Sequence, residues 1–105
     1  MLADNQTISS QIKTAVLSVD PAAEVILFGS RARGDSKKDS DWDVLILIDS
    51  VVTANIERTF RYRLFDLELE TGEVFSTFVN NKKDWNTRHK VTPFYRSIKK
   101  EGVRL

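Results

Sequence analysis

Two apolar segments separated by a polar turn constrain the fold of this chain more than any other feature. Residues 25–28 run into Gly29 and Ser30, and ten residues later a second apolar run opens with Asp41 and Asp43. Side chains two positions apart on a strand lie on the same face, so these two carboxylates are expected to point to one place. Paired carboxylates that face a turn with free backbone N–H groups suit a divalent metal and a polyphosphate.

The apolar periodicity predicts alternating helices and strands along the rest of the chain. Isoleucines and valines at helical spacing predict a first helix that ends before Asp20, and Thr92 followed by Pro93 predicts the start of the last helix. The run beyond Asp43 is apolar on both faces, which favours a covered, central strand. The predicted strands cover 24–28, 42–49 and 73–79, a helical turn covers 30–34, and the longest helix covers 53–70.

Composition narrows the class of protein. A chain of 105 residues fits one domain, and a net charge of +1 gives no support to nonspecific nucleic-acid binding. The sequence has no cysteine, so it has neither a disulfide framework nor a cysteine-based zinc site. The first six residues lack the pattern of a signal peptide, and no apolar run reaches the ~20 residues of a membrane span. We therefore expect a cytoplasmic protein that makes no membrane contact.

Gly29 and Ser30 are candidate phosphate-binding residues. Glycine allows close backbone approach, and the serine hydroxyl and nearby N–H groups can bond phosphate oxygens. An ordinary strand-to-helix turn with serine as its cap would explain the same two residues. That alternative does not explain the aspartate pair that follows.

Arginines and lysines between the two apolar runs are candidates for neutralising a triphosphate. Arg31 and Arg33 can each do so with two parallel hydrogen bonds, and Lys37 and Lys38 add two more charges. Acidic residues are interspersed among these cations, so a mixed-charge, solvated loop is the competing interpretation.

Asp41 and Asp43 are the candidate metal ligands. Mg²⁺ prefers oxygen and usually takes one or two carboxylates together with phosphate oxygens of the substrate. A solvated acidic turn before a strand is the alternative, and it would dominate for an isolated Asp-x-Asp. The upstream Gly29 and Ser30 favour the metal interpretation.

The combination of an apolar strand, Gly29 and Ser30, a ten-residue spacer, and Asp41 and Asp43 with an apolar residue after each resembles the nucleotidyltransferase superfamily typified by DNA polymerase β. In particular it is similar to the minimal nucleotidyltransferases of bacteria and archaea. The motif covers residues 25–49. The resemblance implies an α+β fold with α/β-type layers, in which helices pack on a small mixed β-sheet. It also implies that residues 1–105 form a single minimal nucleotidyltransferase domain.

Active relatives usually carry a third acidic residue on a neighbouring strand. In this sequence the neighbouring strand is predicted at residues 73–79, and Glu73 is its only acid, so Glu73 is the candidate third catalytic residue beside Asp41 and Asp43. Ser76 stands at mid-strand, where the acid would be sought. This departure keeps open an alternative function, a catalytically degenerate domain that binds a nucleotide or a partner.

The resemblance implies a Mg²⁺-dependent transfer of a nucleoside monophosphate, AMP from ATP, to a hydroxyl acceptor on a partner protein. Only 26 residues follow residue 79, so a partner or a second copy must supply the acceptor surfaces, and a homodimer stays open. Minimal nucleotidyltransferases often act with a small helical HEPN-family protein, as the antitoxin of a two-component module. A protein-interaction module with an incidental acidic pair is the third interpretation.

Overall fold

The computed structural model describes residues 5–105. Residues 1–4 lie outside the described part. They make up most of the six-residue segment that lacks the pattern of a signal peptide. The elements along the chain are α1 (Asn5–Val19), β1 (Glu24–Phe28), α2 (Gly29–Arg33), β2 (Trp42–Ile48), α3 (Ala54–Thr71), β3 (Phe75–Asn81), α4 (Lys82–Thr87), the 3-10 turn η1 (His89–Val91), α5 (Pro93–Glu101) and β4 (Val103–Arg104).

The four strands form one mixed sheet in the order β3-β2-β1-β4. Strand β1 runs antiparallel to both β2 and β4, whereas β2 and β3 are parallel and are joined by the long helix α3. Strand β2 therefore has a neighbour on each side, as its apolar sequence predicts. The α+β fold with a small mixed sheet is confirmed.

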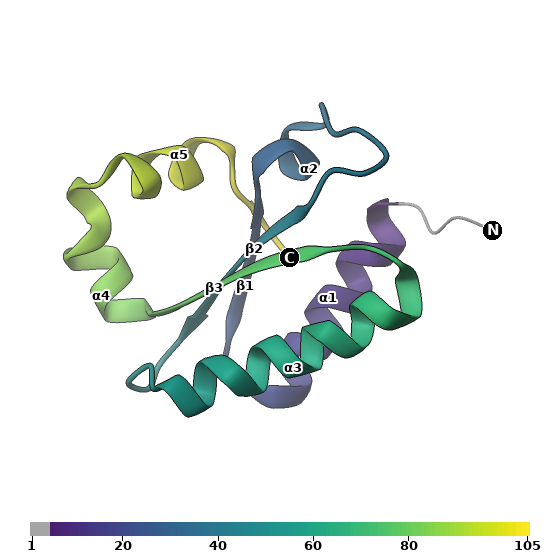
Figure 1. Ribbon diagram of the computed structural model, residues 1–105. Coiled ribbons are helices and arrows are strands. Elements are labelled where there is room, and N and C mark those ends of the chain that lie inside the picture. The colour runs from purple at the N-terminus through teal and green to yellow at the C-terminus, as the bar shows by residue number, and fades with distance from the viewer. Residues whose placement is uncertain (1–4) are drawn as a thin grey trace.

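Helices α1 and α3 lie side by side against one face of the sheet (Figure 1). This helix face carries the larger core, because α1, α3 and every second residue of β2 turn their apolar side chains toward one another. The buried side chains at the centre of this core are Ile8, Ile12, Val16, Trp42, Val44, Ile46, Ile48, Phe60 and Leu64.

The opposite face of the sheet is covered in part by α4, η1 and α5, which we call the C-terminal arm (Figure 1). Leu45 and Leu47 of β2 pack there against Trp85 of α4 and Ile98 of α5. The end of this face that carries Asp43 borders on α2, where β2 begins.

Two features of the sheet differ from the sequence expectation. Strand β3 begins at Phe75, two residues later than expected, because helix α3 runs to Thr71 and ends in a left-handed cap at Gly72. Strand β4 was not expected, because its two residues are too few to show the alternating pattern of a strand. It pairs with Ile26 and Leu27 of β1. Over residues 5–105 no helix combines the length and the apolarity that a membrane crossing requires.

Candidate functional site

Asp43 of β2 lies between Phe28 of β1 and Ser76 of β3, in a row that runs across the three strands. The antiparallel register places Asp43 opposite Phe28 of β1, and the parallel register places it beside Ser76 of β3. Trp42 is fully buried in the core of the helix face. Because side chains alternate along a strand, Asp43 faces the other side, the arm face.

Asp41 joins this row through β3. The Ser76 hydroxyl donates a hydrogen bond to Oδ2 of Asp41, with the two oxygens 3.4 Å apart. The two carboxylates are also close enough for the charge of Asp41 to act on Asp43. The structure thus brings Asp41, Asp43 and Ser76 together at the end of the sheet next to α2.

Gly29 allows the turn after β1 to lie directly against Asp43. Its φ is +72°, in the left-handed region, and a Cβ placed on it would overlap Oδ2 of Asp43. Any larger residue would therefore separate the turn from the carboxylate. The contact between Gly29 and Asp43 joins the two halves of the sequence motif.

The pKa of Asp43 is raised above its ordinary value of 3.8. Burial is the main cause, the charge of Asp41 adds to it, and the charge of Arg33 opposes it. A raised pKa means that the folded protein binds this proton more tightly than the unfolded chain does. Stability therefore falls as pH rises from 3.8 through the folded pKa, and a bound cation would relieve the same unfavourable charge.

Helix α2 follows Gly29 and carries the remaining residues of the predicted phosphate site. The helix begins without a side-chain cap, and the carbonyl of Ser30 accepts hydrogen bonds from the N–H groups of Gly34 and Asp35. Ser30 follows Gly29 directly, so it lies next to the contact between Gly29 and Asp43.

Arg33 lies at the end of α2 and is held by two carboxylates. It donates through Nε to Asp35 and through Nη1 to Glu101 of α5, both at 3.1 Å. These partners raise the pKa of Arg33, the hydrogen bond to Asp35 most strongly. The charge of Arg33 also reaches Asp43, where it lowers the pKa. Arg33 is thus near the candidate site but is engaged by protein carboxylates.

Arg31 holds the loop that precedes β2. Its side chain is only 8% exposed, and its guanidinium donates to the carbonyl of Ser40 at 2.9 Å and to that of Lys38 at 3.3 Å. The same group lies over the ring of Trp42, with the guanidinium carbon 4.8 Å from the ring centroid. These contacts favour a structural role, and the phosphate contact predicted for Arg31 stays a prediction.

Glu73 is not brought to the two aspartates. Its Oε2 accepts a hydrogen bond from the indole N–H of Trp42 at 3.3 Å and lies 3.6 Å from Nη2 of Arg31. The strand-neighbour position beside Asp43 belongs to Ser76. Over residues 5–105 the side chains form no cluster of three or more histidine, cysteine or acidic residues that could hold a metal ion.

The donor set that is present fits one divalent cation with substrate phosphate. Asp41 and Asp43 supply carboxylate oxygens, and Mg²⁺ commonly takes one or two of these and completes its shell with water and phosphate. Burial and, to a lesser extent, the charge of Asp41 raise the pKa of Asp43, and a bound cation would favour the ionised carboxylate. Two aspartates without a third acid favour a site that depends on the substrate for its remaining ligands.

Sequence reasoning missed an aromatic cluster beside the aspartates. Phe28, Phe78 and Phe94 form a triangle with ring centroids 5.4–5.7 Å apart, and Phe28 lies directly opposite Asp43. Phe78 and Phe94 are 42% and 37% exposed. Each is an unremarkable phenylalanine in the sequence, and only the sheet register and the return of α5 bring them together.

The nucleotidyltransferase domain family model matches residues 9–104. A search of curated proteins found no match. Among solved structures, a chain described as a candidate nucleotidyltransferase aligns with a TM-score of 0.64 and 25% identity, covering 93% of this chain and 97% of that one.

Two further solved structures come from toxin–antitoxin systems. One, described as a toxin–antitoxin with AMP-PNP, aligns with a TM-score of 0.67 and 14% identity over 90% of this chain and 69% of that one. The other, a mutant of the MntA–HpeT toxin–antitoxin with two aspartates changed to glutamate, aligns with a TM-score of 0.62 and 13% identity over 97% and 72%. At these identities the two likenesses show a shared fold.

Proposed function

The chain belongs to the nucleotidyltransferase domain family, and we propose that it transfers AMP from ATP to a hydroxyl group on a partner protein, with Mg²⁺ as cofactor. The observation that carries the proposal is the contact of the Asp43 carboxylate with the Gly29 turn, with Asp41 and Ser76 alongside. A single small region thus combines the two carboxylates that we propose as metal ligands with the turn that we propose as the phosphate site.

Each residue of this region has a separate task in the proposal. Asp41 and Asp43 hold Mg²⁺, which neutralises charge on the triphosphate. Gly29 holds the turn against Asp43, and Ser30 offers the phosphates a hydroxyl and a backbone N–H. Arg33 exchanges its carboxylate partners for phosphate oxygens, which it can bind with two parallel hydrogen bonds.

In the proposed reaction the acceptor oxygen forms a bond to the α-phosphorus of ATP, and the bond from that phosphorus to the bridging oxygen breaks. Pyrophosphate leaves, and the acceptor proton passes to solvent. The protein contributes chiefly by holding the triphosphate in line with the acceptor.

The proposal of a partner protein rests on the fold likeness to two toxin–antitoxin structures, one of them with AMP-PNP. We propose a small helical partner of the HEPN family and an antitoxin role for this chain.

A second candidate function is nucleotide binding without transfer. The specific observation in its favour is that Ser76 occupies the strand position beside Asp43, while Glu73 is engaged by Trp42 and Arg31. A domain of this kind would bind MgATP or a partner without catalysing transfer of AMP.

The test is transfer of label from α-³²P-ATP with Mg²⁺ in a lysate of the source cells, comparing the parent protein, Asp43→Asn and Asp39→Asn. Asp39 is an exposed acid of the loop before β2 and is a matched control for loss of charge. Burial and the charge of Asp41 disfavour ionised Asp43, so Asp43→Asn is expected to fold at least as stably as the parent at neutral pH.

We expect a labelled band with the parent and with Asp39→Asn, and a loss of ~100-fold or more with Asp43→Asn. Transfer that persists undiminished in Asp43→Asn would overturn the proposed site. Absence of label from every sample, with Mg²⁺-dependent ATP binding by calorimetry, would establish the binding-only function.

A further inference from the structure

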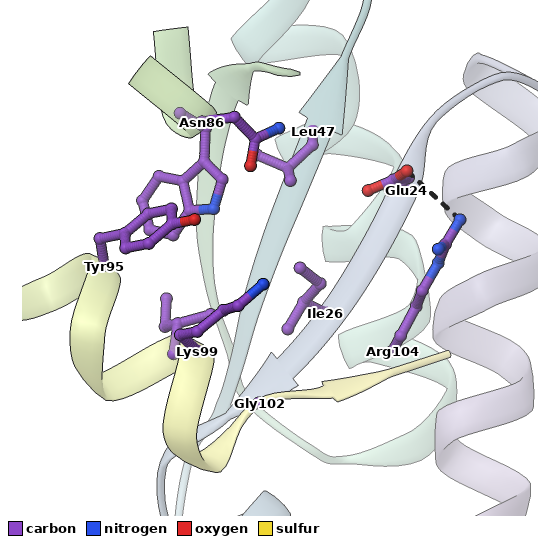
Figure 2. A pocket seen from close by; sticks show the side chains of 10 residues that line it. Glu24, Ile26, Leu47, Asn86, Tyr95, Lys99, Gly102 and Arg104 are labelled. Carbon is purple, nitrogen blue, oxygen red and sulfur yellow. Dashed lines mark hydrogen bonds and ion pairs between the residues drawn. The ribbon is translucent and has the colours of Figure 1, made fainter. Parts of the chain in front are cut away.

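A cavity lies on the arm face, away from the aspartates. It has a volume of about 250 Å³ and is enclosed by β1 and β2 below, by α4 and α5 on one side and by β4 on the other (Figure 2). Leu47 in its floor is four residues from Asp43, which corresponds to ~13 Å along a strand. The aromatic cluster of Phe28, Phe78 and Phe94 covers the sheet between the two places.

The floor of this cavity and its wall toward α4 and α5 are apolar, and polar side chains border the rest of it. Ile26 and Leu47 rise from the sheet, and Ile98 borders them from α5. The rings of Trp85 and Tyr95 stand together at the wall, with centroids 5.2 Å apart. Such a surface favours the body of a planar or aliphatic ligand over water.

The polar groups at the cavity are mainly hydrogen-bond donors. The Lys99 side chain extends into it from α5 (Figure 2), and within residues 5–105 its ammonium makes neither an ion pair nor a hydrogen bond. Arg104 is bound to Glu24 at 3.2 Å, so the one carboxylate is already paired. In the same described part, the Trp85 indole N–H and the Tyr95 hydroxyl also donate to no protein acceptor.

A donor-rich cavity with one unpaired cation and an apolar wall selects for a particular ligand chemistry. We propose that it binds a small aromatic monocarboxylate, whose carboxylate pairs with Lys99 and whose ring lies against Trp85 and Tyr95. The volume lies below the ~300–1,000 Å³ of pockets for drug-sized ligands, so the site suits a single ring with one acidic group. The Lys99 side chain is exposed and therefore hydrated in the free protein, and a carboxylate gains a charge-assisted hydrogen bond there that a neutral ligand cannot make.

The test is an NMR titration of the ¹⁵N-labelled full chain with benzoate, read at the indole N–H signals. Trp85 lines the cavity, whereas the indole of Trp42 is bonded to Glu73 and buried in the core of the helix face. The Trp42 signal is therefore an internal control, and Trp85→Phe assigns the two signals. Benzamide is the uncharged isostere of the probe.

Lys99→Met removes the ammonium and keeps an unbranched apolar stem. Lys100→Met is the matched control, because Lys100 is adjacent on the same helix and does not line the cavity. We expect benzoate to give a saturable shift of the Trp85 signal, with a Kd raised about tenfold in Lys99→Met and unchanged in Lys100→Met. Benzamide is expected to bind about fivefold or more weakly than benzoate.

Equal affinities of Lys99→Met and Lys100→Met, or no saturable shift at ~20 mM benzoate, would overturn the proposal. Titrating Asp43→Asn, and the parent with MgATP present, separates this cavity from the aspartate site. Unchanged benzoate affinity in both supports a distinct site, and loss of binding in either contradicts it. These outcomes do not depend on whether the chain transfers AMP.

Discussion

Gly29 and Gly34 bracket α2 and share a backbone conformation for different reasons. Both have φ in the left-handed region, +72° and +84°. A Cβ on Gly34 would meet nothing within 4 Å, whereas a Cβ on Gly29 would overlap the Asp43 carboxylate. Gly34 provides the left-handed cap that ends α2. Gly29 begins α2 and lets the turn lie against Asp43 of the candidate metal site.

Alanine substitutions at these two positions should distinguish two contributions to the free energy of unfolding. One is the cost of a left-handed backbone conformation, and the other is the cost of displacing the Asp43 carboxylate. We expect Gly34→Ala to lower the free energy of unfolding by about 1 kcal/mol, the usual cost of a left-handed non-glycine residue. Gly29→Ala should cost about 2–4 kcal/mol and also abolish Mg²⁺-dependent ATP binding, because Asp43 must move away. Urea unfolding and calorimetry measure the two effects. Equal losses of stability and intact ATP binding in both variants would contradict the proposed contact.

At the scale of an element, Arg31 of α2 makes the contacts that tie the end of the loop between α2 and β2 to the rest of the protein. Arg31 binds the backbone carbonyls of Lys38 and Ser40 and stacks on Trp42, which itself donates to Glu73. The loop ends at Asp41, so the position of this carboxylate follows from the loop. Arginine is needed because its planar fork can reach two carbonyls while its face lies on the indole.

Arg31→Met is expected to lower the free energy of unfolding by about 2 kcal/mol and to speed proteolysis within residues 34–41, because the loop carbonyls lose their charged donor. Lys37→Met, in the same loop and exposed, should change stability by less than about 0.5 kcal/mol. Urea unfolding and limited proteolysis provide the measurements. If Arg31→Met weakened ATP binding without any change in stability or proteolysis, Arg31 would be a phosphate ligand, as its sequence position predicts.

On the scale of the whole molecule, the sheet separates two cores of unequal size. The core under α1 and α3 contains most of the buried side chains, whereas the core under the C-terminal arm consists of Leu45, Leu47, Trp85 and Ile98, with partly buried neighbours. Arg33 and Glu101 link α2 to α5 across the surface. The arm thus has fewer apolar contacts than the rest of the chain, which favours its opening without global unfolding.

Native-state hydrogen exchange can detect this difference. Ile98→Ala should lower the protection of amides in α5 by about 10–100-fold while leaving α1 and α3 nearly unchanged. Ile12→Ala, a matched truncation in the core of the helix face, should lower protection in every element by a similar amount. If the two variants gave the same pattern across the chain, the arm and the sheet would unfold as one unit.

Much of the architecture was predictable from local sequence. Residues 24–28 form β1 as predicted, and the last helix begins at Pro93 with Thr92 as its cap, also as predicted. Caps and periodicities act over a few residues, so they can be read along the chain. The nucleotidyltransferase motif was readable for the same reason, because its spacing joins two local signals.

The placement of Glu73 could not be read in this way. Its sequence position at the edge of the third strand is compatible with the aspartate site, but the turn after Gly72 directs it to Trp42 and Arg31. Likewise the Phe28 cluster and the Lys99 cavity depend on the return of α5 and β4 onto β1. No local pattern encodes these contacts.

The sequence by itself determined the first three strands and the helices between them, the central place of β2 and the family to which the chain belongs. The tertiary structure alone decided which strand residue lies beside Asp43, which cations are paired and where the cavity beside Lys99 forms. The physical reason is that local propensity depends on neighbours within a few residues. Side-chain contacts between distant segments instead depend on the strand register and on how the C-terminal helix packs back onto the sheet. Both are determined by burial of apolar side chains from the whole chain.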